Sequence, residues 1–268
     1  MKRYLGSNNA FKAVVIFACC ALPVIASSNM EKPMPEANAV DILSGEHRTP
    51  AYVLRDEYRN PVETLAFFQV EKSQTIVEIW PGGGWYTEIL APLLKEHGQF
   101  YAASFPAETP VEYYKKSRAK YDAKLAANPE VYGAVKVTEL APPEFTDIAP
   151  MGSADRVLTF RNVHNWMKAG SAEGVFAAMH KALKADGLLG IVEHRAKPGT
   201  SFDDMIKSGY VTEAAVIKLA TDAGFELVAA SELNANSADT ADHPKGVWTL
   251  PPSLRLGDTD KDKYLAIG

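Results

Sequence analysis

The sequence predicts an α/β fold in which helices cover both faces of a doubly wound, mostly parallel sheet. Three observations support this prediction. Short β-branched segments alternate with helical patterns along most of the chain. The chain has 268 residues, of which 47% are hydrophobic, so one domain can bury a sizeable core. No internal repeat or Gly/Ser-rich linker interrupts residues 46–268, which we therefore expect to form a single domain.

The first 26 residues have the pattern of a secretory signal peptide. Basic residues at positions 2, 3 and 12 accompany an apolar run from Ala13 to Ile25, and Val24-Ile25-Ala26 has the small-residue pattern of a cleavage site. A membrane-spanning helix needs about 20 apolar residues. This run is shorter and contains Pro23. We therefore expect cleavage after Ala26, export to the periplasm and no stable membrane insertion afterwards.

The net charge and the cysteine positions indicate which kinds of partner and site the protein can have. The chain has 28 Lys and Arg against 33 Asp and Glu, a formal net charge of −5, which argues against sequence-independent binding of nucleic acid. Cys19 and Cys20 both lie in the predicted signal peptide, so the exported chain would have no disulfide or thiolate site. A lipid anchor at Cys19 fits less well, because Phe17 is bulky for the recognition sequence. We expect a small-molecule partner, and the sequence does not indicate an oligomeric state.

A flexible leader is expected before the domain. Residues 27–45 contain Pro and Glu without hydrophobic periodicity. Asn60 is then predicted to cap a helix that begins at Pro61, with Glu63 bonding back to the cap.

The following segments alternate between strand and helix. A β-branched run at residues 75–80 is short enough for a buried strand, and a helix is expected from about Tyr86 to His97, where Gly98 stops it. Further strands are predicted at 99–105, 134–140, 156–160, 188–193 and 225–233, with helices at 111–127, 172–184 and 213–223.

A glycine-rich loop carries the strongest chemical signal. Gly82, Gly83 and Gly84 follow the strand at 75–80 and precede a helix, and Glu78 stands just before them. Glycines at this position let the backbone approach a nucleotide closely. The order of strand, loop and helix therefore predicts a nucleotide-type site.

The glycine loop, the motif Ala182 to Gly187 before a later strand, and the predicted strand order resemble class I S-adenosylmethionine-dependent methyltransferases. Three motifs, Glu78 to Leu90, Leu158 to Trp166 and Val192 to Arg195, more closely resemble a bacterial group of predicted exported methyltransferases. This closer resemblance runs from about Arg48 to the end. The resemblance implies a Rossmann-like sheet and S-adenosylmethionine as cofactor. It also implies cofactor binding by Glu78, Trp80, Gly82, Gly83, Gly84 and Asn162.

The chain departs from the broader family pattern in three places. Trp80 stands where the usual loop has its first glycine. The second strand ends Ala103-Ser104-Phe105, without the acid that usually holds the ribose hydroxyls. The last antiparallel strand of such sheets has only weak candidates, at 246–250 and 264–267, so we expect that it is missing and leaves an open edge.

Polar residues follow two further predicted strands. Arg161 and His164 come after the strand at 156–160, and Glu193, His194 and Arg195 end the strand at 188–193. The carboxyl ends of parallel strands share one crevice, so we expect these residues to face the glycine loop.

We interpret this cluster as the catalytic group. His164 or His194 would be the base, Glu193 would orient it, and Arg161 or Arg195 would bind an anionic group. Neighbouring strand residues point to opposite faces, which favours His164 over His194. The alternative is that the charges form structural ion pairs. No short His spacing is present, so no metal site is expected.

Two functions follow from these patterns. The first is transfer of a methyl group from S-adenosylmethionine to a small-molecule acceptor in the periplasm. The second is a non-catalytic, methyltransferase-derived protein that binds a ligand in the same crevice. The converging polar groups favour the enzyme, whereas Trp80 and the export signal favour the binding protein.

Overall fold

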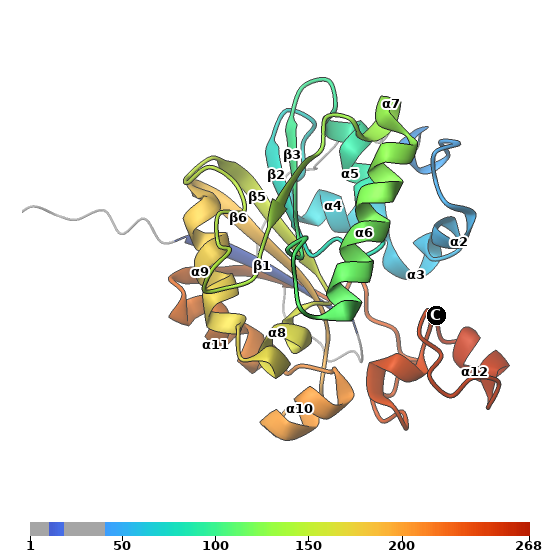
Figure 1. Cartoon of the computed structure of the whole chain (residues 1–268). Helices are drawn as coiled ribbons and strands as arrows, with labels where there is room; N and C mark the ends of the chain where they lie inside the picture. The colour runs from blue at the N-terminus through green and yellow to red at the C-terminus, as the bar shows by residue number, and fades with distance from the viewer. Residues whose placement is uncertain (1–10, 19–40) are drawn as a thin grey trace, which may run out of the picture.

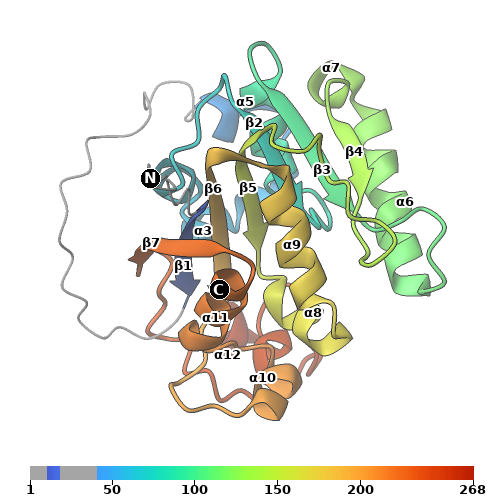
Figure 2. The same ribbon diagram turned by 90° about the vertical axis from the view of Figure 1, so that its left-hand side faces the viewer.

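The computed structural model describes residues 11–18 and 41–268, with side chains for the second range only. Its centre is a seven-stranded sheet in the order β4-β3-β2-β5-β6-β1-β7, and all its strand pairs are parallel (Figures 1 and 2). The strands are β1 (Phe11–Ala18), β2 (Thr75–Ile79), β3 (Gln99–Ser104), β4 (Lys136–Glu139), β5 (Ala154–Phe160), β6 (Leu183–His194) and β7 (Phe225–Ser231).

Helices cover both faces of this sheet, which confirms the predicted doubly wound α/β fold. In Figure 1, α4 and α5 lie on one side of the strands, and α9 and α11 lie on the other. Each face has its own apolar core, one centred on residues such as Phe68 and Leu90, the other on Trp166 and Phe176. The helices are α2 (Pro50–Val53), α3 (Asp56–Arg59), α4 (Pro61–Phe67), α5 (Thr87–Leu94), α6 (Glu112–Ala127), α7 (Pro129–Tyr132), α8 (Val163–Ala169), α9 (Ala172–Ala182), α10 (Phe202–Ser208), α11 (Glu213–Asp222), the 3₁₀ turn η1 (Gly246–Thr249) and α12 (Lys261–Leu265).

The strand order reverses between β2 and β5. From β2 the chain moves outward on one side through β3 to β4, and from β5 it continues on the other side to β6. Open parallel sheets bind ligands outside the carboxyl ends of the strands at such a reversal. The loop after β2 and the loop after β5 therefore define the place where a site is expected.

Two local predictions are wrong. Asn60 does not cap α4 with its side chain, which donates instead to the carbonyl oxygen of Leu233 at 3.3 Å and to Asn234 at 3.1 Å. The predicted helical end at Leu183 and Lys184 belongs to β6, because Leu183 pairs with Ala154 of β5. In both cases a contact distant in sequence replaces the local pattern.

Strand β1 lies in the segment that the sequence analysis set aside as a signal peptide. It runs parallel between β6 and β7, from Lys12 opposite Leu188 to Ala18 opposite His194. An apolar, β-branched run suits both a signal peptide and a buried parallel strand, so the sequence pattern does not separate them. The predicted cleavage site and residues 27–40 of the predicted leader lie outside the described residues.

No strand follows β7 within residues 232–268, and the position between β6 and β7 is taken by β1. The segments at 246–250 and 264–267 form a 3₁₀ turn and part of a short helix instead. In the described part of the chain, no helix has the length and apolar character that crossing a membrane requires.

Candidate ligand-binding site

Two adjoining cavities lie at the reversal of strand order. The first, of about 480 Å³, contains the glycine loop, and the second, of about 240 Å³, contains the strand-end histidines. Arg55, Arg59, Arg161 and Pro252 line both of them, so the two cavities meet at these residues. A volume of several hundred Å³ is typical of small-molecule sites.

Gly82 and Gly83 of the glycine loop form one wall of the first cavity, whereas Gly84, also predicted to bind the cofactor, lines neither cavity. Gly82 has a φ of +58°, and a Cβ added there would meet no atom within 4 Å, so the loop is open towards the cavity at this point. A Cβ at Gly83 would come within 2.2 Å of the Tyr52 hydroxyl, which donates to the Gly83 carbonyl at 2.9 Å. The predicted loop is therefore open at Gly82 and packed against Tyr52 of α2 at Gly83.

Two non-glycine residues in left-handed conformation mark the ends of the neighbouring strands. Trp80, directly after β2, has a φ of +47°, and Arg161, directly after β5, has a φ of +63°. Such conformations cost about 1–3 kcal/mol each and persist where the surrounding structure imposes them. Their side chains line the first cavity from both strands of the reversal.

The Trp80 indole is a fixed wall of the first cavity. Its ring centroid lies 4.5 Å from that of Phe105 and 6.0 Å from that of Trp166, and its N–H donates to the Leu140 carbonyl at 3.1 Å. The space that a glycine would leave open is thus filled by an aromatic ring in contact with β3 and α8.

Asn162 and Glu78 also line the first cavity. Asn162 Nδ2 donates to the Ile79 carbonyl at 3.0 Å and joins the end of β5 to the end of β2. Glu78 is 2% exposed, and its carboxylate accepts a hydrogen bond from Thr87 Oγ1 at 2.7 Å. Burial raises the pKa of Glu78 to about 8, so this carboxyl group is largely protonated at neutral pH.

Glu193 fixes His164 in the second cavity. The carboxylate is fully buried and lies 3.1 Å from His164 Nδ1, while the backbone N–H groups of His164 and His194 donate to it at 3.3 and 2.8 Å. His164 Nε2 has no hydrogen-bond partner among the described residues, and the ring lines the cavity. The predicted contact between Glu193 and His164 is therefore present.

Of the neighbouring residues His194 and Arg195, only His194 lies in the candidate site. His194 lines the second cavity, where burial and the neighbouring Arg161 charge hold its pKa well below the usual value. Arg195 forms an ion pair with Glu232 and lines neither cavity. Of the two arginines proposed to bind an anion, Arg161 is the one that lines the cavities.

Arg55 and Arg59, which the sequence analysis missed, come from α3 and the turn before it. This segment is tied to α5 by buried Glu88, which accepts from the Thr49 backbone at 3.0 Å, from Arg48 at 3.2 Å and from Lys124. A four-residue helix has no hydrophobic periodicity to reveal which side it turns towards the sheet.

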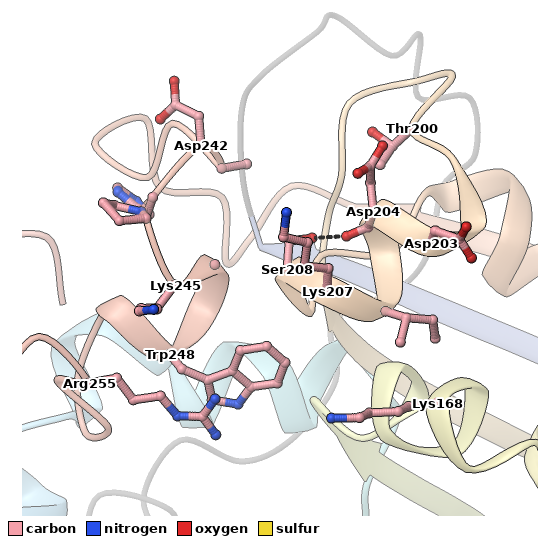
Figure 3. Close-up of a pocket in the computed structure, with 15 residues that line it drawn as sticks. Lys168, Thr200, Asp203, Asp204, Lys207, Ser208, Asp242, Lys245, Trp248 and Arg255 are labelled. Carbon is pink, nitrogen blue, oxygen red and sulfur yellow. Dashed lines mark hydrogen bonds between the residues drawn. The ribbon is translucent and has the colours of Figure 1, made fainter.

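The largest of the three cavities lies elsewhere. Its volume is about 780 Å³, and it is lined by residues of α8, α10 and the C-terminal segment (Figure 3). Asp203 and Asp204 lie in the upper half of Figure 3, and Lys168 and Arg255 lie in the lower half. It contains neither the glycine loop nor the strand-end residues, and shares only Trp248 with the second cavity. Charges of both signs on a wide surface do not converge on one reactive centre, so we place the candidate site in the two smaller cavities.

Comparisons with protein-family models and with curated proteins find no match. Comparison with solved structures finds similarity to an S-adenosylmethionine-dependent methyltransferase from Aquifex aeolicus, with 18% identity over 66% of this chain and 83% of that one and a TM-score of 0.47. A cyclopropane-fatty-acyl-phospholipid synthase-like protein from Lactobacillus casei has 16% identity over 70% of each chain and a TM-score of 0.40.

The buried Glu78 carboxyl group should make stability depend on pH. Its pKa of about 8 in the folded chain lies above the ordinary value of 4.5 for a glutamate, so the folded state holds a proton that the unfolded state releases between these pH values. Stability from this group is complete below about pH 4.5 and is lost as pH rises to 8, by up to about 1.4 kcal/mol per pH unit. Glu78→Gln removes this contribution. Urea unfolding at several pH values should give a flatter profile for the variant, whereas parallel profiles would contradict the raised pKa.

Proposed function

We propose that the protein binds S-adenosylmethionine in the first cavity and transfers its methyl group to a small acceptor in the second. The observation that carries this proposal is the meeting of a glycine-loop cavity and a His–Glu pair at one reversal of strand order. The open face of Gly82 and the aromatic walls fit a nucleoside.

S-adenosylmethionine supplies an electrophilic methyl group on a positively charged sulfur. Transfer breaks the sulfur–methyl bond, forms a bond from that carbon to the acceptor atom and releases the acceptor's proton. In this chain His164 Nε2 is placed to take that proton, because Glu193 occupies Nδ1. Glu193 acts as a positioning residue, and Trp80, packed against Trp166, forms an apolar wall of the first cavity.

Binding of the cofactor can be tested with a matched pair of glycine variants. Gly82 and Gly152 have similar φ values of +58° and +65°, and an added Cβ meets no atom within 4 Å at either, but only Gly82 lines the first cavity. We expect Gly82→Ala to weaken binding of S-adenosylhomocysteine by about tenfold, or 1.4 kcal/mol, in a calorimetric titration. Gly152→Ala should bind like the unaltered protein. Absence of binding by the unaltered protein would contradict the proposal.

The base assignment can be tested without knowing the acceptor. Neutral His164 should carry its proton on Nδ1, where it faces Glu193, and leave Nε2 free. His47 and His243 are controls for the opposite tautomer, since their Nε2 atoms contact the Glu88 carbonyl at 2.8 Å and Asp239 at 3.0 Å. Nitrogen NMR of labelled histidine should distinguish them. Protonation of His164 at Nε2 would exclude it as the base.

The second candidate function is a ligand-binding protein without methyl transfer. The fixed indole of Trp80 favours it, because the ring reduces the space beside the loop. Incubation with labelled S-adenosylmethionine and pooled small acceptors separates the two functions. Methylated product that disappears in His164→Ala, while binding of S-adenosylhomocysteine is retained, supports the enzyme. Tight binding with no product in the unaltered protein supports the binding protein.

We also propose export to the periplasm, on the sequence of residues 1–26. Cleavage after Ala26 would remove β1 and open the sheet between β6 and β7. Intact-mass analysis of the protein from the periplasmic fraction should find a chain that begins at Ser27. A chain that retains residues 1–26 would instead make β1 part of the working fold and contradict the proposed cleavage.

A further inference from the structure

Three arginines meet at the junction of the two cavities without a carboxylate partner. Arg55, Arg59 and Arg161 line both cavities, and none of them forms an ion pair with a side-chain carboxylate within residues 41–268. Arg48, Arg118 and Arg195 do form such pairs: Arg48 contacts Asp56 at 2.9 Å, Arg118 contacts Asp122 at the same distance, and Arg195 contacts Glu232. The junction is therefore a site of uncompensated positive charge in a chain whose net charge is −5.

The side-chain carboxyl groups in and beside the two cavities have other partners. Glu193 is bonded to His164, and Asp239, which lines the second cavity, accepts from Tyr210 at 2.6 Å and contacts His243. Glu78 lines the first cavity, but its raised pKa of about 8 keeps it largely uncharged at neutral pH. The Glu193 charge favours the charged form of Arg161, but none of these groups forms an ion pair with the three guanidinium groups.

The arginines are held in place by contacts that do not neutralise them. The Arg59 guanidinium lies 4.6 Å from the centroid of the Trp85 ring, which fixes it by a cation–π contact. Arg161 is held by the left-handed backbone at the end of β5. Burial lowers the pKa of all three, and the neighbouring positive charges lower it further for Arg55, to about 10, and for Arg59. An anion bound between the three guanidinium groups would therefore reduce the repulsion among their positive charges.

From this arrangement we infer that Arg55, Arg59 and Arg161 form an oxyanion site for the acceptor, which carries a phosphate or another doubly charged oxyanion group. Guanidinium groups bind phosphate and carboxylate oxygens by paired hydrogen bonds. Three of them exceed what one carboxylate needs. The inference rests on the proposed methyl transfer for the identity of the ligand as acceptor, but the anion site itself does not.

A bound anion would also serve methyl transfer electrostatically. Three guanidinium groups repel a positively charged sulfur in the neighbouring cavity, and this repulsion is strong where water is excluded. A doubly charged group bound among them cancels two of the three positive charges and so weakens this repulsion. The acceptor would thus lower the cost of bringing the methyl donor close.

The test uses the full chain, with inorganic phosphate as the probe at about pH 8, where it carries two charges. Calorimetric titration should show saturable phosphate binding that Arg59→Gln and Arg161→Gln weaken by about tenfold each. Arg255→Gln is the matched control. Arg255 also lacks a carboxylate partner in the described chain and stacks on Trp248 at 4.4 Å, but it lines the largest cavity only. If Arg255→Gln weakens phosphate binding as much as Arg59→Gln and Arg161→Gln do, the proposed oxyanion site is wrong.

A second measurement covers the case in which these variants fold poorly. Phenylglyoxal modifies accessible guanidinium groups, so mass spectrometry of the unaltered protein should show that phosphate protects Arg55, Arg59 and Arg161 but not Arg255. Acetate at equal ionic strength is the control for screening. Equal modification with and without phosphate would overturn the inference.

Titration of S-adenosylhomocysteine in the presence and absence of phosphate separates this inference from the proposed function. If both ligands bind independently, both proposals are supported. If phosphate competes with S-adenosylhomocysteine but not with methylthioadenosine, which lacks the carboxylate, the arginines belong to the cofactor and the inference fails. Phosphate binding without any binding of S-adenosylhomocysteine leaves the anion site intact and contradicts methyl transfer.

Discussion

The architecture of the candidate site depends on the reversal of strand order between β2 and β5. Two neighbouring parallel strands end together there, and their loops leave in opposite directions, so a crevice forms between them. Trp80 and Arg161 stand at equivalent positions after these strands, both in left-handed conformation. Asn162 joins the two strand ends by its hydrogen bond to Ile79. The strained turns direct an indole and a guanidinium group into the same space.

Buried acids hold the rest of the site around this crevice, each in a different way. Glu193 accepts three hydrogen bonds and orients His164. Glu88 ties the segment before α3 to α5 and so places Arg55 and Arg59 above the crevice. Within residues 41–268, the Thr87 hydroxyl is the one hydrogen-bond donor to Glu78, and burial favours the protonated form of this side chain. Glu88 and Glu193 thus use their hydrogen bonds to position other groups and form no ion pair with the arginine cluster of Arg55, Arg59 and Arg161. The positive charge of this cluster is therefore available to a ligand.

Local patterns in the sequence predicted much of the fold. The strands at 75–80, 99–105 and 156–160 and the glycine loop were predictable, because hydrophobic runs and glycines act over a few residues. The end of α9 could not be predicted from local pattern, because Leu183 belongs to β6 through its pairing with Ala154 of β5. The strand order explains why residues following β2 and β5 share one crevice. Arg55 and Arg59 could not be predicted, because a tertiary contact through Glu88 positions them. The same holds for the pairing of Arg195 with Glu232, 37 positions away.

The central claim is that the glycine loop, the His164–Glu193 pair and the arginine cluster serve one ligand-binding crevice. A crystal structure of the complex with S-adenosylhomocysteine tests it most directly. We predict that the adenosine lies in the first cavity against Gly82, with the sulfur directed towards the junction with the second cavity. A nucleoside bound in the cavity between Lys168 and Asp203, or a sulfur directed away from His164, would contradict the account.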